Sequence, residues 1–179
     1  MAYKEIRYLP VFTDTSDRYE AFASSGISFA DGTFYLMKRE SVKRDNGMLS
    51  IDSGQLIAYH PDTGEEKVLL DEAEMGESVA AATPVSGGAV ITFLKNPNSG
   101  YRLSKTDSEG EEMFSTDISL SGELINIWLL ADSNGKCCLI TREEIRLFDG
   151  EGHPAGTIDL SGKSVNQAVS NGGTVYLYD

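Results

Sequence analysis

Short runs of apolar and β-branched residues alternate along this chain with compact turn signals. The clearest example is 56–70, where an apolar and aromatic run ends at Tyr59 and a second run follows from Glu65. Between them, Pro61 fixes φ and Gly64 accepts a positive φ without a steric penalty, which is typical of a tight turn. The pattern predicts a β-hairpin, because apolar and aromatic residues suit a half-buried pleated surface.

The turn signals recur along the chain in two series. Dipeptides typical of hairpin turns stand between apolar runs at Asp31-Gly32, Gly87-Gly88, Asn134-Gly135 and Gly172-Gly173. The second series resembles the turn of the first hairpin and lies at 60–64, 107–110 and 149–152. Both series repeat at intervals of roughly 40–55 residues, and each interval holds about four strands.

Four-stranded antiparallel units at this spacing are typical of a β-propeller blade. We therefore predict an all-β fold, a propeller-like array of four-stranded antiparallel blades that is incomplete, with about three and a half blades. The approximate units are 21–74, 75–120, 121–162 and 163–179, preceded by an N-terminal strand at 3–12. The alternative is a jelly roll or an ordinary sandwich, which would not need repeats in phase.

Three segments break the regular pattern. Residues 13–20 are polar and are predicted to form a loop. Residues 39–54, which include the basic and apolar stretch 43–48, are predicted to be a loop insertion in the first unit, and loops are where such scaffolds keep their contacts. The acidic stretch 71–82 is predicted to be a linker between blades. No window keeps a helical spacing of apolar residues without a Gly or Pro.

The composition excludes some classes of function. With 28 Asp and Glu against 15 Lys and Arg, the 179 residues carry a formal charge of −13. This charge argues against nucleic acid as a partner and against an anionic membrane surface. No apolar run is long enough for a spanning helix, so direct membrane insertion is not expected. The sequence leaves the localisation open, and export or the cell surface is favoured over the cytoplasm if a signal peptide has been removed.

The two cysteines, Cys137 and Cys138, are adjacent in an apolar run. Neighbours on a strand point to opposite faces, so a disulfide between them is not expected. One such pair supplies too few ligands for a metal site. We predict that at least one thiol is buried.

No catalytic, cofactor or metal motif is present in the sequence, so no catalytic, cofactor-binding or metal residue is assigned, no cofactor is expected and the ligand stays unknown. His60 and His153 each precede a proline and are interpreted as turn residues. Segments 45–47 and 149–151 hint at calcium ligation but lack the full ligand spacing.

The paired carboxylates are Glu65-Glu66, Glu111-Glu112 and Glu143-Glu144. They suit acid–base chemistry, although the solvated faces of outer strands explain them as well. Trp128 is predicted to be a core residue of an inner strand.

The pattern Leu-x-x-Tyr-x-Pro-Asp-Thr-Gly-Glu at 56–65 resembles the repeat of quinoprotein-type and related bacterial β-propellers. The Trp that often follows the Gly in quinoprotein repeats is absent from all three units, which removes the support for cofactor binding of that kind. Residues 8–12 are similar to the propeller segment that precedes the solute-binding domain in some surface lipoproteins of Gram-positive gut bacteria. This second resemblance implies a segment of a larger, transport-related surface protein.

Two classes of function follow from these observations. The first is a non-catalytic binding or scaffold module, part of a larger exported or cell-surface bacterial protein, with a protein, small-molecule or carbohydrate ligand. The second is a carbohydrate-active hydrolase or lyase that uses axial carboxylates, and it requires two carboxylates to converge in a cleft.

The last unit has only two strands, at 165–170 and 174–179. We therefore expect self-association through the terminal strands.

Overall fold

The computed structural model describes residues 12–15, 18–22, 28–43, 49–98, 100–120, 126–163, 165–171 and 173–178, with backbone alone at 12–22 and 40–53. The predicted N-terminal strand at 3–12 lies outside these residues except for its last position, Phe12, where the first strand begins.

The chain forms strands almost throughout its described length. They are β1 (Phe12–Thr15), β2 (Arg18–Phe22), β3 (Ser28–Ala30), β4 (Thr33–Lys43), β5 (Leu49–His60), β6 (Glu65–Asp71), β7 (Ser78–Pro84), β8 (Val90–Asn96), β9 (Gly100–Thr106), β10 (Glu112–Ile118), β11 (Trp128–Ala131), β12 (Cys137–Ile140), β13 (Glu144–Phe148), β14 (Pro154–Asp159), β15 (Gln167–Asn171) and β16 (Thr174–Tyr178). The short helical segments are α1 (Glu72–Met75) and the 3-10 turn η2 (Ser86–Gly88).

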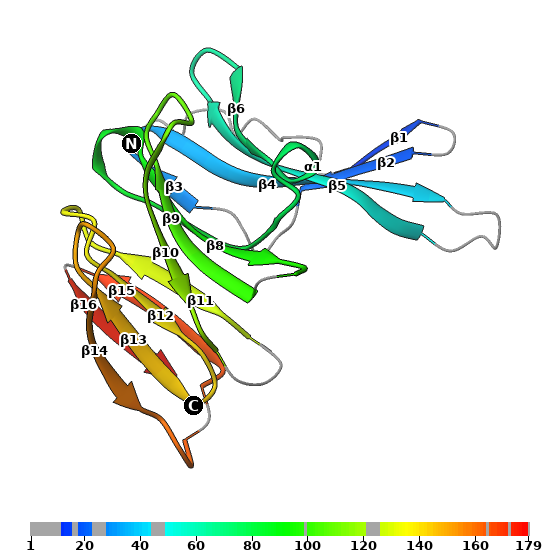
Figure 1. Ribbon diagram of the computed structural model, residues 1–179. Coiled ribbons are helices and arrows are strands. Elements are labelled where there is room, and N and C mark those ends of the chain that lie inside the picture. The colour runs from blue at the N-terminus through cyan, green and yellow to red at the C-terminus, as the bar shows by residue number, and fades with distance from the viewer. Residues whose placement is uncertain are drawn as a thin grey trace.

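These strands form four antiparallel sheets (Figure 1). Sheet A contains β1 to β6, sheet B contains β7 to β10, sheet C contains β11 to β14, and sheet D contains β15 and β16. Sheets B and C pair their four strands in chain order, and β3 to β6 do the same within sheet A. Taking β3 to β6 as the blade of sheet A, the first strands of successive blades lie beside one another, since β7 contacts both β3 and β11, and β11 contacts β15. The protein is therefore an all-β, incomplete propeller-like array, with three full blades and half of a fourth.

The predicted turns form where the sequence places them. Asp31 and Gly32 both have positive φ, 49° and 79°, and join β3 to β4 as a tight hairpin. Asp107, Asp132 and Asp149 each accept hydrogen bonds from two backbone amides of their own turn, at 2.8 to 3.0 Å. In all three turns, the amide of the following glycine donates to the carbonyl of the aspartate. The repeated Asp-x-x-Gly pattern thus fixes three of the connections.

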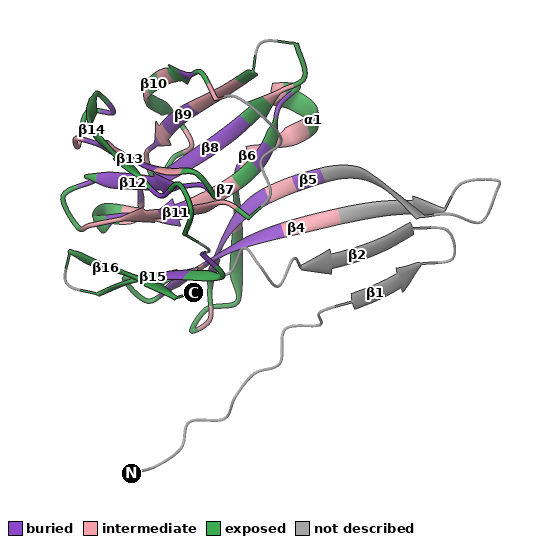
Figure 2. Ribbon diagram, turned by 90° about the horizontal axis from the view of Figure 1, so that it is seen from below, coloured by how far each residue is buried: buried purple, intermediate pink, exposed green. Residues whose placement is uncertain are grey.

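The blades pack through apolar layers between neighbouring sheets (Figure 2). Along β8, Val90 and Leu94 point into the layer shared with sheet A, while Ile91 and Phe93 point into the layer shared with sheet C. A strand covered on both faces is apolar at most positions rather than at alternate ones, and the one buried polar residue of β8, Thr92, donates to the Ser104 carbonyl. The layer between sheets C and D contains Cys138, Ile140, Ile145, Leu160, Val165 and Ala168.

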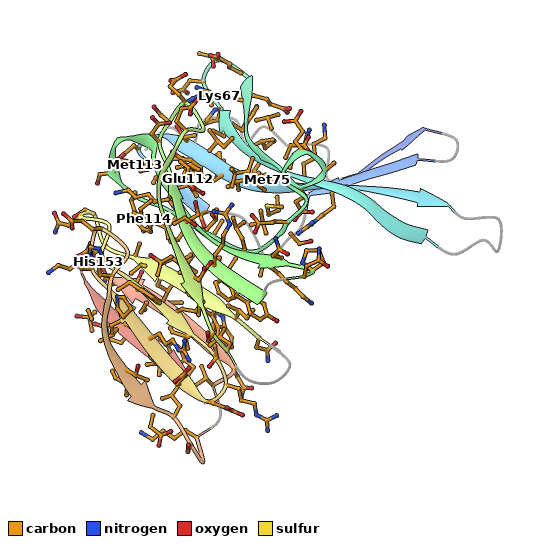
Figure 3. All side chains as sticks on the ribbon, in the orientation of Figure 1. Lys67, Met75, Glu112, Met113, Phe114 and His153 are labelled. Atoms are coloured by element: carbon orange, nitrogen blue, oxygen red, sulfur yellow. The ribbon has the colours of Figure 1, made fainter. Side chains whose placement is uncertain are left out.

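The turn of sheet C closes against sheet B. Thr116 on β10 donates to the Gly152 carbonyl oxygen at 3.0 Å. A Cβ on Gly152 would overlap the ring of Phe114, which Figure 3 labels on β10, and Gly152 has a φ of 83°. Glycine is therefore required here by two separate constraints, the backbone conformation and the close approach of the next sheet.

Two loop predictions in the N-terminal part of the chain were wrong. Residues 13–20 contribute to β1 and β2, which form a hairpin. The insertion at 39–54 continues β4 and β5, with Arg39 paired to Gly54 and Lys43 to Leu49. β2 pairs with this extension of β4. A polar segment can form strands when it extends a sheet beyond the apolar layers, since ladder hydrogen bonds do not depend on an apolar face. Residues 44–48, which make up most of the basic and apolar stretch 43–48, lie outside the described part.

The predicted linker at 71–82 contains a short helix and the start of β7. Asp71 caps α1 by accepting from the amides of Ala73 and Glu74, and the helix ends at Gly76, whose φ is 68°. We call residues 71–78 the strap, because they carry the chain from sheet A to sheet B.

The strap carries two glutamates whose side chains are each 9% exposed. Glu72 accepts from Arg39 of sheet A and, at 2.7 Å, from the Val79 amide of sheet B. Glu77 accepts from Nε of Arg102 on β9 at 2.8 Å, and Arg102 also donates to Glu112. These buried carboxylates are paired with guanidinium groups, which avoids the cost of leaving a charge unpaired in a core.

Candidate functional site

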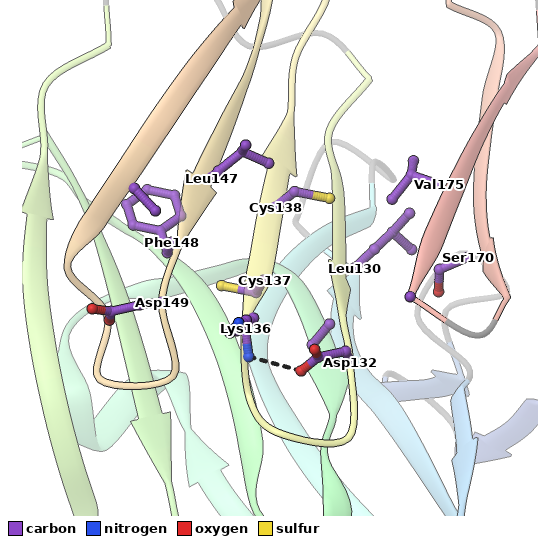
Figure 4. Close-up of a pocket in the computed structure, with 13 residues that line it drawn as sticks. Leu130, Asp132, Lys136, Cys137, Cys138, Leu147, Phe148, Asp149, Ser170 and Val175 are labelled. Atoms are coloured by element: carbon purple, nitrogen blue, oxygen red, sulfur yellow. Dashed lines mark hydrogen bonds between the residues drawn. The ribbon is translucent and has the colours of Figure 1, made fainter.

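A groove of about 380 Å³ lies between sheets C and D (Figure 4). Its lining residues are Leu130, Ala131, Asp132, Lys136, Cys137, Cys138, Leu147, Phe148, Asp149, Ala155, Ser170, Gly173 and Val175. They come from all four strands of sheet C and from the hairpin of sheet D. We call it the C–D groove.

The pairing register explains which side chains reach the groove. Leu130 pairs with Cys138, and Cys138 pairs with Leu147, so these three side chains share the face of sheet C that points to sheet D. On sheet D, Ser170 pairs with Val175, and both line the opposite wall. The walls are therefore mainly apolar, with polar side chains confined to the turn end.

The groove is open because sheet D covers only part of sheet C. Ile145 on β13 is 7% exposed, whereas Ile158, its direct partner on β14, is 49% exposed. The third and fourth strands that cover the equivalent surface in the complete blades have no counterpart among the described residues of sheet D. The outer half of the sheet C face thus remains in contact with solvent.

The two thiols lie on opposite faces of β12, as Figure 4 shows. Cys137 belongs to the layer between sheets B and C, and Cys138 belongs to the layer between sheets C and D. Both are free and 5% exposed, which confirms the prediction of burial. Burial raises the pKa of Cys137 to about 12 and the pKa of Cys138 to about 11. Both thiols are therefore protonated at neutral pH and are weak nucleophiles.

Two carboxylates, Asp132 and Asp149, stand at the turn end of the C–D groove. One oxygen of each already accepts two backbone amides within its own turn. Hydrogen bonds from the His153 and Glu151 amides hold the pKa of Asp149 below its ordinary value. A general acid for glycoside hydrolysis needs a raised pKa instead. The arrangement supports turn formation more directly than acid–base chemistry.

His153 lies in a turn, as predicted, whereas His60 is the last residue of β5 and borders its turn. The Nδ1 atom of His60 is 3.0 Å from the Thr33 hydroxyl, which links the ends of β5 and β4. His153 is exposed, with its Nδ1 atom 3.2 Å from an Asp149 carboxylate oxygen. Neither histidine lines the C–D groove.

The paired glutamates do not form a common site. Glu65 and Glu66 are exposed on β6, and Glu144 is paired with Arg146 on its own strand. Glu111 and Glu143 are exposed in turns, and the exposed Glu112 accepts from Arg102 and Ser104 of its own sheet. Segment 149–151 is a turn held by Asp149, and 45–47 falls outside the described residues. Among the described residues, no three His, Cys, Asp or Glu side chains are grouped so that they could hold a metal ion. No helix in the described part of the chain is long and apolar enough to cross a membrane.

Trp128 is half-buried at the start of β11 and packs against the layer between sheets C and D. The predicted core position is met only in part, because the side chain is half-buried and β11 is a terminal strand of sheet C. The C–D groove itself was missed at the sequence level, because it arises from the packing of two sheets. The available signal was the apolar run 137–140 beside a unit with only two strands.

No family model matches the sequence, and no curated protein matches it either. Among solved structures, the chain is similar to a protein from Bacteroides ovatus that is provisionally described as a hydrolase, with a TM-score of 0.42 and 10% sequence identity. The match covers 84% of this chain and 48% of that protein, so the chain spans about half of its length. A similarity at this level assigns neither a fold nor an activity.

Proposed function

We propose that the protein is a non-catalytic binding or scaffold module, part of a larger exported or cell-surface bacterial protein of the β-propeller type. The observation that carries the proposal is the open, apolar C–D groove. Its volume of about 380 Å³ and its apolar walls, with polar groups at one end, are typical of a binding site. The resemblance of residues 56–65 to bacterial propeller repeats supports the larger context.

The alternative function, a carbohydrate-active hydrolase or lyase, would use Asp132 and Asp149, which line the same groove. Both carboxylates are engaged by turn amides, and the lowered pKa of Asp149 is opposite to that of a catalytic acid. The geometry therefore favours binding over hydrolysis.

Titration with Nile red, a neutral apolar dye, tests the proposal without repulsion from the charge of −13. We expect saturable binding of one dye molecule per chain. The substitution Ala155→Trp fills the groove and should abolish binding, whereas Ala73→Trp, on the exposed surface of α1, should not. Equal binding by the two variants, or no saturable binding by the native chain, would contradict the proposed function.

A further inference from the structure

The last strand, β16, has the sequence of an interior strand. β8 and β12 are the second strands of sheets B and C, and their long apolar runs are buried between two neighbouring strands. β16 is the second strand of sheet D and reads Thr-Val-Tyr-Leu-Tyr, yet each of its residues is exposed. The same kind of sequence is thus covered in the blades of sheets B and C and uncovered in sheet D.

The outer edges of the three complete blades carry protection against pairing, and β16 does not. The pairings of β6, β10 and β14 with their neighbours each contain a bulge or register shift. These strands also carry charged residues, and β14 begins with Pro154. The pairing of β15 with β16 is regular, and β16 has no charge or proline. Bulges, charges and prolines are the means by which sheets prevent further pairing, so β16 is suited to accept another strand.

The C–D groove continues the layer that sheets C and D already share. Ala168 is buried in this layer, and Leu177 lies opposite Ala168 on the same face of sheet D. A third and a fourth strand of sheet D added beyond β16 would extend this face over Leu147 and Ile158 of sheet C. The added strands would bury apolar surface at the same time as they pair with the free edge.

A second copy of the chain does not fit this edge. Antiparallel pairing of β16 with its own copy needs a two-fold axis perpendicular to the sheet. Both copies of sheet C would then lie on the same side of the joined sheet, over the same four strand positions. Their volumes would overlap, so the occupant has to be a segment without a sheet C of its own at that place.

We propose that β16 and the C–D groove together accept a β-hairpin, which supplies the third and fourth strands of sheet D. This inference rests on the proposed binding function and names the class of ligand. The hairpin pairs antiparallel to β16 through main-chain hydrogen bonds and places alternate apolar side chains against sheet C. Pairing of this kind adds a strand to an exposed sheet edge.

The register identifies the backbone groups that receive the hairpin. Asn171 pairs with Thr174, and Val169 pairs with Tyr176. A two-residue connection closes on a hydrogen-bonded pair, and such pairs alternate with non-hydrogen-bonded ones. The amides of Thr174, Tyr176 and Tyr178 therefore point to β15. The amides of Val175 and Leu177 point to the free edge.

Hydrogen exchange with single-residue resolution tests the proposal. The probe is a synthetic peptide with residues 142–160 of this chain, which contain the third and fourth strands of sheet C and pair antiparallel within that sheet. We expect the peptide to slow exchange at Val175 and Leu177 while the exchange rate at Tyr176 stays nearly constant. A peptide of the same composition in scrambled order is the control.

Two variants separate edge pairing from general effects on sheet D. Val175→Pro removes one outward amide and leaves the amides that face β15, so it should weaken peptide binding roughly five- to tenfold, the effect of about one hydrogen bond. Val169→Ala alters the opposite face of sheet D and should leave peptide affinity unchanged. Unchanged exchange in sheets A to C shows that each variant is folded.

The outcomes distinguish the hairpin proposal from the proposed function. If Nile red binds the C–D groove but the peptide does not protect Val175 and Leu177, the hairpin proposal is overturned and the binding function stands. If neither binds, both are overturned. Protection of these amides that rises with protein concentration, without peptide, would identify a second copy as the occupant and would also overturn the proposal.

Discussion

Replacement of Glu77 by Gln tests whether a buried ion pair holds the end of the strap against sheet B. The substitution keeps the size of the side chain and removes its negative charge. Arg102 then loses the carboxylate that accepts from its Nε atom at 2.8 Å and from its terminal nitrogen at 2.6 Å. The side chain of Arg102 is 22% exposed, so the unpaired guanidinium remains partly desolvated.

The expected loss of unfolding free energy follows from these contacts. Removal of one partner from a fully buried pair costs about 3–5 kcal/mol. Arg102 keeps Glu112 and Ser115 as acceptors and has some access to water, which lowers the cost. We expect a loss of about 2 kcal/mol, comparable to one charge-assisted hydrogen bond. In a domain of this size, that loss lowers Tm by roughly 4–8 °C.

The pH dependence gives a second, independent readout. The Arg102 guanidinium that donates to Glu77 holds the pKa of this carboxyl below its ordinary value. A carboxyl with a depressed pKa in the folded state contributes stability above its unfolded pKa, near 4.3, and this contribution is lost as the pH falls further. The stability difference between native protein and the Glu77→Gln variant should therefore be constant near pH 7 and shrink below about pH 4.

Urea unfolding followed by the fluorescence of Trp128 measures both effects. The control is Glu112→Gln, which affects the same arginine through a side chain that is 47% exposed, and it should cost less than about 1 kcal/mol. Equal losses from the two substitutions, or a difference that does not change at low pH, would refute the role assigned to Glu77.

Three further predictions concern other parts of the fold. Gly152→Ala should lower the unfolding free energy by about 2–4 kcal/mol, because the new methyl group overlaps the ring of Phe114 and the φ of this residue is positive. The control Gly162→Ala, with a positive φ but open space around it, should lower it by about 1 kcal/mol in the same assay. Cys137 and Cys138 should react with Ellman's reagent far more slowly at pH 8 than after unfolding, since burial raises the pKa of both thiols, and rapid reaction of the native protein would contradict their burial. The isolated chain should self-associate at micromolar concentration by stacking the outer face of sheet D, where Tyr176 is exposed. Light scattering should detect dimers or larger species, and Tyr176→Lys should disperse them. A monomeric native protein would contradict this prediction.

The array could be predicted from the sequence because its signals are local. Asp31-Gly32 and the Asp-x-x-Gly turns contain within a few residues the backbone conformations that join the strands. The opposite orientation of Cys137 and Cys138 likewise follows from the two-residue period of a strand.

The features that were missed depend on contacts between distant segments. Glu72 and Glu77 look like solvated charges in an acidic stretch, and only the pairing of distant strands brings Arg39 of sheet A to Glu72 and Arg102 of sheet B to Glu77. The C–D groove has the same origin, since Leu130 and Val175 are 45 residues apart and meet through the stacking of two sheets. Turns can thus be predicted from the local sequence, whereas buried charges and the shape of a groove can be seen only in the folded structure.

Because the first strand of each blade lies against that of the blade before it, the order of the blades in space is also the order in which a ribosome releases them. Each blade closes mainly through hairpins between sequence neighbours and needs only the preceding blade as a surface on which to pack. The chain can therefore acquire its structure from the N-terminal side while synthesis continues, one blade at a time. A defect in the strap would then stall the docking of sheet B on sheet A at an early stage of translation, before the cysteines of sheet C have left the ribosome.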